Sequence, residues 1–155
     1  TLTNELDKLA TAALGSGIIT MELVDALVGR SRELSNFELA DHLVARNRTR
    51  ALQTLQRLLN DGAEPVMLIG LIASNYHRLA LAKELMSRNA SKEEVFRLVG
   101  MPFSKREEFL ATARRSDARR LAQSIQRIAA ADLAIKTSQA TPRLQLELLI
   151  CELAA

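Results

Sequence analysis

The sequence predicts an all-α protein: a compact bundle of about six to seven helices, preceded by two further helices. Leucine and alanine, which lose little conformational freedom in a helix, occur 27 and 23 times among 155 residues. Apolar residues recur at helical spacing almost throughout, and the breaks carry residues typical of helix caps. No stretch has a convincing strand pattern. The short breaks suit neighbouring antiparallel helices in a compact bundle.

The composition is that of an ordinary globular domain. It is 48% hydrophobic, 25% charged and 3% aromatic, with a net charge of +3, which excludes a disordered or fibrous chain. The longest apolar run, residues 66–73, is far shorter than the roughly 20 residues that span a bilayer. The single cysteine, Cys151, cannot form an internal disulfide, so a reducing cytoplasm is expected.

Two helices are expected at the start of the chain. The first covers residues 2–13 and ends at the Gly-Ser-Gly sequence 15–17. The second follows Thr20, a suitable N-cap, and ends near Gly29, where a left-handed residue is favoured. Two helices are too few to build a core, and no Met or signal pattern precedes them. We therefore expect them to be the end of a domain that begins before Thr1.

The main bundle begins with three predicted helices. A capping box over residues 35–38 starts the first, which runs to Ala45. The polar sequence 46–49 opens the second, which ends at the Asn-Asp-Gly sequence 60–62. Pro65 starts the third, because a proline suits the first helical turn, where its missing N–H would be unpaired anyway.

The third helix should be the centre of the bundle. Its apolar pattern continues to about Arg88, and residues 66–73 are apolar on nearly every side. Such a helix is typically buried. We therefore expect the other helices to pack around it.

Four more helices complete the bundle. Capping boxes at 91–94 and 104–107 begin two short ones, separated by a turn at 100–102. A long helix is expected within 117–137, and Thr141-Pro142 starts the last one. The apolar positions expected to face the core of the last two helices are Leu121, Ile125, Ile128, Leu133, Ile135, Leu144, Leu148, Leu149 and Leu153.

The charge distribution suggests where one domain ends. Residues 1–30 hold four acids and two bases, a local charge of −2, so the remaining residues carry +5. A charged linker lies near residues 29–35. We therefore predict one segment over 1–30 and a helical domain over 31–155.

A catalytic site is not expected. The sequence lacks a P-loop, a dinucleotide fingerprint and a His-Glu-x-x-His motif, so we predict no enzymatic activity and no cofactor. His42 follows Glu38 by one helical turn, and the two could share a metal ion. Asp41, the nearest third ligand, points about a quarter turn away. A solvated helix surface is the simpler interpretation, and no metal site is predicted.

The remaining titratable residues also have structural explanations. His77 could act as a general base, but a partly buried, hydrogen-bonded histidine is far more common. Cys151 follows three apolar residues, where a small buried apolar role is expected rather than a reactive thiolate. The glutamate pairs 93–94 and 107–108 lie in first helical turns, where they complement the helix dipole.

The basic residues are the stronger functional candidates. Arginine outnumbers lysine 16 to 5, which suits bidentate contacts with carboxylates or phosphates. Residues 46–57 hold four arginines and no acid, and residues 104–127 hold seven bases and three acids. These charges could contact phosphate, pair with acidic helices of a protein neighbour, or form a solvated face. The few aromatic residues and the absence of a recognition-helix motif argue against sequence-specific DNA reading.

Several short segments of the sequence resemble those of a known protein family. They are NELDKLA at 4–10, ITMELVDALVG at 19–29, NFELADHLVARN at 36–47, RALQTLQRLLNDGAEP at 50–65, and AADLAIKT at 130–137 with the leucine-rich stretch 144–153. Together they resemble the delta subunit of the bacterial DNA polymerase III clamp loader, where its lid domain passes into its C-terminal collar domain. The resemblance extends over essentially the whole chain.

The resemblance implies a role in assembly. It makes residues 1–30 the end of the lid and residues 31–155 the collar domain, which in this family joins five subunits into a closed ring. The implied partners are subunits of the gamma/tau and delta-prime type, in a bacterial cytoplasm at the nucleoid. The chain would hold delta in place during DNA replication without hydrolysing ATP, while a separate N-terminal domain grips the sliding clamp.

The same resemblance suggests which residues to test. Primer-template DNA passes near the collar, so Lys136 is a candidate for a weak electrostatic DNA contact. Interfaces between subunits have apolar centres and charged rims, and for such a rim we select Arg114, Arg115, Arg119 and Arg120. No membrane partner is expected. The alternative hypothesis is a helical nucleic-acid-binding module unrelated to the clamp loader.

Overall fold

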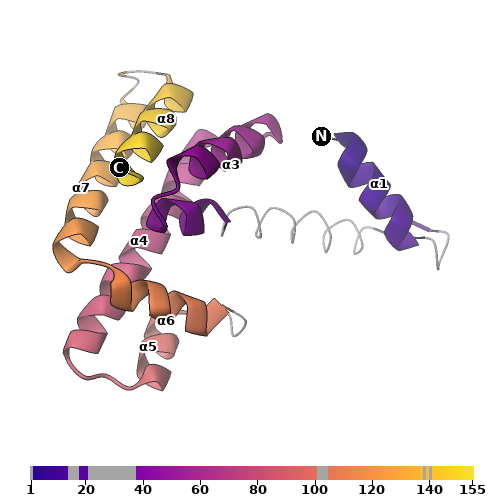
Figure 1. Cartoon of the computed structure of the whole chain (residues 1–155). Coiled ribbons are helices and arrows are strands. Elements are labelled where there is room, and N and C mark those ends of the chain that lie inside the picture. The colour runs from indigo at the N-terminus through magenta and orange to yellow at the C-terminus, as the bar shows by residue number, and fades with distance from the viewer. Residues whose placement is uncertain (1, 14–17, 21–37, 101–104, 138, 140) are drawn as a thin grey trace. The chain divides into compact units, whose positions relative to one another are not determined.

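The computed structural model describes residues 2–13, 18–20, 38–100, 105–137, 139 and 141–155 (Figure 1). All regular secondary structure in these ranges is helical, which confirms the predicted all-α class. The contacts divide the chain into two compact units, residues 1–64 with Ala154 and residues 65–153 with Ala155. The predicted boundary between residues 30 and 31 lies outside the described residues.

The first unit contains two of the expected helices and part of a third. Helix α1 covers Leu2–Ala13, as predicted. The predicted helix after Thr20 lies outside the described residues. Residues 38–44 are helical, in agreement with the helix expected to run to Ala45, although the capping box at its start is not among the described residues.

A tight connection joins the helical segment 38–44 to α3, which covers Arg48–Asn60. The N–H of Arg46 donates to the carbonyl of Leu43 at 3.1 Å, and the N–H of Asn47 donates to the carbonyl of His42 at 2.9 Å. This is the hydrogen-bond pattern of a Schellman motif, and Arg46 takes its left-handed position with a φ of 56°. The Asn47 side chain then accepts from the N–H of Arg50 and caps α3.

The second unit is built around one long helix, α4, which covers Pro65–Ser87. It contacts α5 (Lys92–Val99), α6 (Arg106–Arg115), α7 (Ala118–Lys136) and α8 (Pro142–Leu153) (Figure 1). The prediction of a central helix is therefore confirmed. Its buried positions are Leu68, Ile69, Ile72, Tyr76, Leu79 and Ala82.

The start of α4 corrects one detail of that prediction. Val66 is 50% exposed and Met67 is 48% exposed, although both belong to the stretch that is apolar on nearly every side. The buried residues of α4 recur every three or four positions along one side. Val66, Met67 and Gly70 fall between them, on a stripe that faces solvent.

Side-chain caps form at two helix starts of the second unit, and the one at Ser91 was predicted. The Ser91 hydroxyl accepts from the N–H of Glu94 at 3.2 Å, and the Asp117 carboxylate accepts from the N–H of Arg120 at 2.8 Å. The capping box predicted at 104–107 lies partly outside the described residues, because Ser104 is not described. Helix α6 begins at Arg106, and the side chain of Lys105, which precedes it, forms no cap hydrogen bond.

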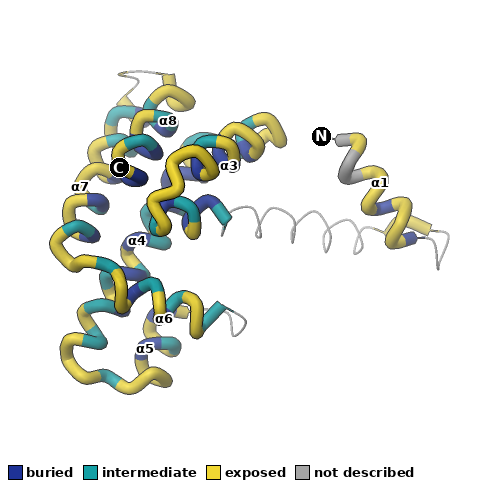
Figure 2. The backbone as a smooth tube through the Cα atoms, viewed as in Figure 1, coloured by how far each residue is buried: buried dark blue, intermediate teal, exposed yellow. Residues whose placement is uncertain are grey.

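The ends of α7 and α8 expose residues that the sequence pattern assigns to the core. Leu121, Ile128, Ile135, Leu149 and Leu153 are buried, as expected. Leu133, Leu144 and Leu148 are instead 60%, 48% and 51% exposed. Figure 2 shows that buried residues follow one side of each helix and exposed residues the other. One helical pair cannot enclose apolar residues that point in several directions.

Candidate partner-binding surfaces

The residues considered for a metal site form an ion-pair cluster in the first unit. A guanidinium nitrogen of Arg57 (Nη2) donates to Glu38 Oε2 at 2.5 Å, and His42 Nε2 lies 3.5 Å from Glu38 Oε1. The hydrogen bond from Arg57 lowers the pKa of the Glu38 carboxyl, although partial burial opposes this effect. Glu38 is therefore engaged by an arginine. Among the described residues, no three His, Cys, Asp or Glu side chains come together as metal ligands.

Three other titratable residues occupy separate places in the second unit. His77 is exposed, contrary to the partly buried role expected for it, and its Nδ1–H donates to the carbonyl of Ala73 at 2.8 Å. Burial raises the pKa of Tyr76 to about 12, and the positive charge of Arg120 opposes part of that shift. Cys151 is half-buried, where full burial was expected, because it lies on the side of α8 away from the buried residues Leu146, Leu149, Ile150 and Leu153. No helix in the described ranges is both long and apolar enough to cross a membrane.

The four arginines selected as an interface rim lie on either side of one turn. Arg114 and Arg115 end α6, and Arg119 and Arg120 belong to the first turn of α7. Because only residues 116–118 separate the two pairs, the structure brings all four to one corner of the second unit. We call these four residues the arginine corner.

The members of the arginine corner differ in their availability. Arg114, Arg115 and Arg119 are exposed. Arg120 is half-buried, and its guanidinium donates to the main-chain oxygen of Ala155. Lys83 adds a further positive charge, since its ammonium group donates to the carbonyl of Arg114 at 2.8 Å. Three guanidinium groups thus remain directed to solvent, and the fourth helps to hold the end of the second unit.

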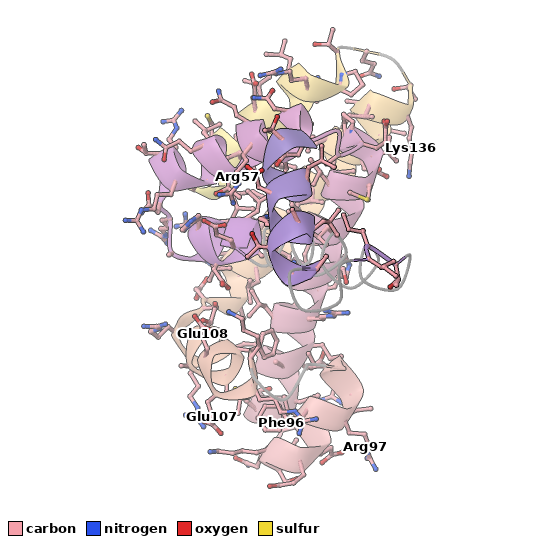
Figure 3. All side chains as sticks on the ribbon, turned by 90° about the vertical axis from the view of Figure 1, so that its right-hand side faces the viewer. Arg57, Phe96, Arg97, Glu107, Glu108 and Lys136 are labelled. Carbon is pink, nitrogen blue, oxygen red and sulfur yellow. The ribbon has the colours of Figure 1, made fainter. Side chains whose placement is uncertain are left out.

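Lys136 lies at the other end of α7. Its ammonium group donates to Asp132 at 2.7 Å, and 59% of its side chain is exposed. Figure 3 shows Lys136 far from the end of the unit that carries Phe96, Glu107 and Glu108. Because Arg119 and Arg120 lie in the first turn of α7 and Lys136 is its last residue, the structure does not bring Lys136 together with the arginine corner. Ser138 and Ala140 of the following loop lie outside the described residues.

A second surface, which the sequence pattern assigned to the core, lies on α8. Leu144 and Leu148 are one helical turn apart, and we call this pair the α8 apolar strip. Ion pairs flank it: Arg143 donates to Glu147 at 3.0 Å, and Arg127 of α7 donates through Nε to Glu152 at 2.9 Å. An apolar centre with charged neighbours is the usual anatomy of a protein interface.

The signal for this strip is present in the sequence. At 100° per residue, Leu144 and Leu148 fall on one side of α8, and Leu146, Ile150 and Leu153 fall on another. The structure buries the second set and exposes the first. A helix with two apolar sides needs a second neighbour, and one side of α8 has none within the second unit.

The chain resembles known proteins along nearly its whole length. The family model for the DNA polymerase III delta subunit, C-terminal domain, matches residues 33–153. DNA polymerase III subunit delta of Bacillus subtilis (strain 168) is 28% identical over 149 residues, which cover 96% of this chain and 43% of that protein. The solved structure of the Bacillus subtilis DNA clamp loader delta protein has a TM-score of 0.74 and 27% identity. That match covers 97% of this chain and 44% of the solved chain.

The chain therefore spans less than half the length of these two relatives. The family model, in contrast, matches well over half of this chain, including all helices from α3 to α8. A match of that extent over a helical architecture of the same kind establishes the relationship. The chain belongs to the family of the DNA polymerase III delta subunit, C-terminal domain.

Proposed function

We propose that this chain is a non-catalytic assembly module of a bacterial clamp loader. It holds the delta subunit in a collar ring beside subunits of the gamma/tau and delta-prime type, so that the complex can load a sliding clamp during DNA replication. The observation that carries the proposal is the similarity to a clamp loader delta structure over 97% of this chain, at a TM-score of 0.74. ATP hydrolysis belongs to the partner subunits, and contact with the clamp belongs to a separate domain.

The proposal extends to domain organisation and location. Residues 1–30 form the end of the lid domain, and residues 31–155 form the collar domain. Such a complex works in the cytoplasm at the nucleoid. Family membership removes the alternative of a helical module unrelated to the clamp loader. Lys136 remains a candidate for a weak contact with primer-template DNA, and its pairing with Asp132 reduces the charge it can offer.

A subunit inside a closed ring needs two different surfaces, one for each neighbour. The second unit carries two candidates, and they lie at opposite ends of α7. The arginine corner surrounds the start of this helix, and the α8 apolar strip begins at Leu144, soon after the loop that follows its end. We assign the strip to an interface centre, because exclusion of apolar surface from water drives association. The arginine corner is assigned to a rim, where charges determine pairing and register.

The α8 apolar strip is tested by placing charges in it. In the complete protein, L144E together with L148E should abolish or strongly weaken co-elution with the gamma/tau and delta-prime type subunits in size exclusion. The two leucines are half exposed, so the thermal midpoint of the isolated protein should change little. L98E is the matched control, because Leu98 is 51% exposed on α5. Unchanged co-elution of the double variant would exclude this strip as an interface.

The arginine corner is tested separately by charge reversal. R114E with R119E should weaken the same association, and the loss should be larger at low salt, because exposed charges are screened as salt rises. Arg120 is left intact, since its guanidinium bonds to the main chain of Ala155. If the unmodified protein fails to associate with the loader subunits even at low salt, the assembly role itself is wrong.

A further inference from the structure

Three arginines at the start of α3 form a surface that neither the fold nor the proposed assembly role uses. Arg46 and Arg48 flank the N-cap Asn47, and Arg50 completes the first helical turn. All three are exposed. Within the described part of the chain, none of the three side chains takes part in an ion pair or a side-chain hydrogen bond. We call Arg46, Arg48 and Arg50 the α3 arginine cluster.

Local folding preferences do not explain an arginine at position 46. Four described residues have a positive φ: Arg46, Gly62, Asn89 and Gly100. Glycine and asparagine are the residue types that tolerate this conformation, and they occupy three of the four positions. Arg46 is the exception. Its side chain thus occupies a position where a smaller residue would suit the backbone better.

The helix dipole also disfavours the other two arginines. The N-terminus of a helix carries a partial positive charge, which acidic residues complement. Helices α5 and α6 follow this rule with Glu93, Glu94, Glu107 and Glu108 in their first turns. Helix α3 has no acid in its first turn, and Arg50 occupies the position at which a capping box would have a glutamate. The cluster thus gathers positive charge against the preferences of the helix.

We propose that the α3 arginine cluster binds the phosphate backbone of duplex DNA. Planar guanidinium groups bind phosphate oxygens in a bidentate manner, and the positive end of the α3 dipole adds to the attraction. The surroundings favour DNA over a protein partner. No large apolar residue described between positions 38 and 64 is exposed, whereas a protein interface needs an apolar centre. Interfaces with DNA are more polar and positively charged.

The composition of this region also specifies the mode of binding. Residues 38–64 contain no Phe, Tyr or Trp on which a base could stack. Binding should therefore be independent of sequence and should favour duplex over single-stranded DNA, because the duplex has the higher density of phosphate charge. This inference goes beyond the assembly role, since DNA binding can be measured without any partner subunit.

The experiment compares two triple variants of the complete protein that remove equal charge. The test variant is R46N with R48Q and R50Q. The control is R88Q with K92Q and R97Q, three exposed cations at the end of α4 and on α5. Binding to a fluorescently labelled duplex of about 20 base pairs is followed by anisotropy, at about 50 to 200 mM salt. Thermal unfolding confirms that both variants fold.

The expected result is specific to the cluster. The test variant should bind the duplex at least about tenfold more weakly at low salt, and the slope of log K against log salt should flatten by about 2 to 3, since each lost phosphate contact contributes about 0.9. The control should bind within about twofold of the unmodified protein. The thermal midpoint of the test variant should be unchanged or higher.

Several outcomes would overturn the inference. Equal losses in both variants would show a diffuse effect of net charge. Tighter binding to a single strand of the same length would contradict the preference for a duplex. Unchanged DNA affinity of the test variant, combined with a loss of association with the loader subunits, would make the cluster a protein contact. Failure of co-assembly with normal DNA binding would instead contradict the assembly role and leave the DNA site standing.

Discussion

Glu38 shows how a single neighbouring residue determines the role of a titratable side chain. Its spacing from His42 fits a shared metal ion, and the two side chains do lie close together. Arg57, 19 residues further along the chain, approaches the same carboxylate more closely. The resulting hydrogen bond holds the pKa of Glu38 below its ordinary value of 4.5. An ionised carboxylate engaged by a guanidinium contributes to folding and is a poor ligand for a cation.

This ion pair predicts a pH-dependent effect of E38Q. Because the pKa of Glu38 is lower in the folded state, its contribution is present at neutral pH and is lost as the pH falls below the ordinary value of 4.5 and through the lowered folded pKa. Both side chains are about half exposed, so the substitution should cost at most about 1 kcal/mol of unfolding free energy at pH 7. Urea unfolding at pH 7 and about pH 3 measures the difference, and an equal or larger loss in acid would contradict the assignment.

Arg46 predicts a substitution that stabilises the protein. Its φ of 56° lies in the left-handed region, which costs a non-glycine residue about 1–2 kcal/mol. R46G removes this strain but adds about 0.5–1 kcal/mol of chain entropy to the unfolded state. The net result should be a gain of up to about 1 kcal/mol, measured by urea unfolding. R78G, inside α4, should destabilise the protein and serves as the control, since Arg78 has ordinary helical geometry.

At the scale of elements, α4 shows how a strongly apolar helix divides its residues between core and solvent. Ile72 is fully buried, and Val66, less than two turns earlier, is half exposed. The two residues have similar side chains in the same helix. Their different burial follows from the positions of α5, α6, α7 and α8, which cover only part of the circumference of α4.

This division predicts unequal effects of truncation along α4. I72A should lower the free energy of unfolding by about 2–5 kcal/mol, because it leaves a cavity among close-packed side chains. V66A should change it by no more than about 0.5 kcal/mol, since its side chain is half exposed. Chemical denaturation of both variants gives the comparison. Similar losses at the two positions would mean that Val66 is covered in solution.

At the scale of the whole molecule, stability should be distributed unevenly. Helix α4 contacts four other helices and contains six buried residues. Helix α1 has two buried residues among its described side chains, Leu9 and Ala13. A segment unfolds locally most easily where few apolar residues are buried. Helix α1 should therefore unfold locally far more easily than α4.

Amide hydrogen exchange measures this distribution. Amides between Leu68 and Ala82 should exchange slowest, with free energies approaching that of global unfolding, and amides of α1 should exchange fastest among the described helices. The order follows from burial and needs no partner protein. If the amides of α1 exchanged as slowly as those of α4, α1 would be covered in solution by contacts that the described residues do not show.

The sequence by itself determined the helices and most of their ends. Cap residues and prolines act on their own helical turn, so Pro65, Ser91, Asp117 and Pro142 mark helix starts without reference to the rest of the fold. The predicted start of α6 lies partly outside the described residues, because Ser104 is not described. The all-α class and the central helix were predictable for the same reason, since apolar periodicity is a local property.

The tertiary structure alone decided which apolar residues reach the surface and which charges meet. Leu144 and Leu149 are equivalent by composition, but one is half exposed and the other buried, because only one side of α8 faces α4 and α7. Arg127 and Glu152 pair across 25 residues, which no local pattern encodes. Burial and ion pairing depend on neighbours distant in sequence. The exposed apolar residues and the ion pairs between helices are therefore decided by how the helices pack.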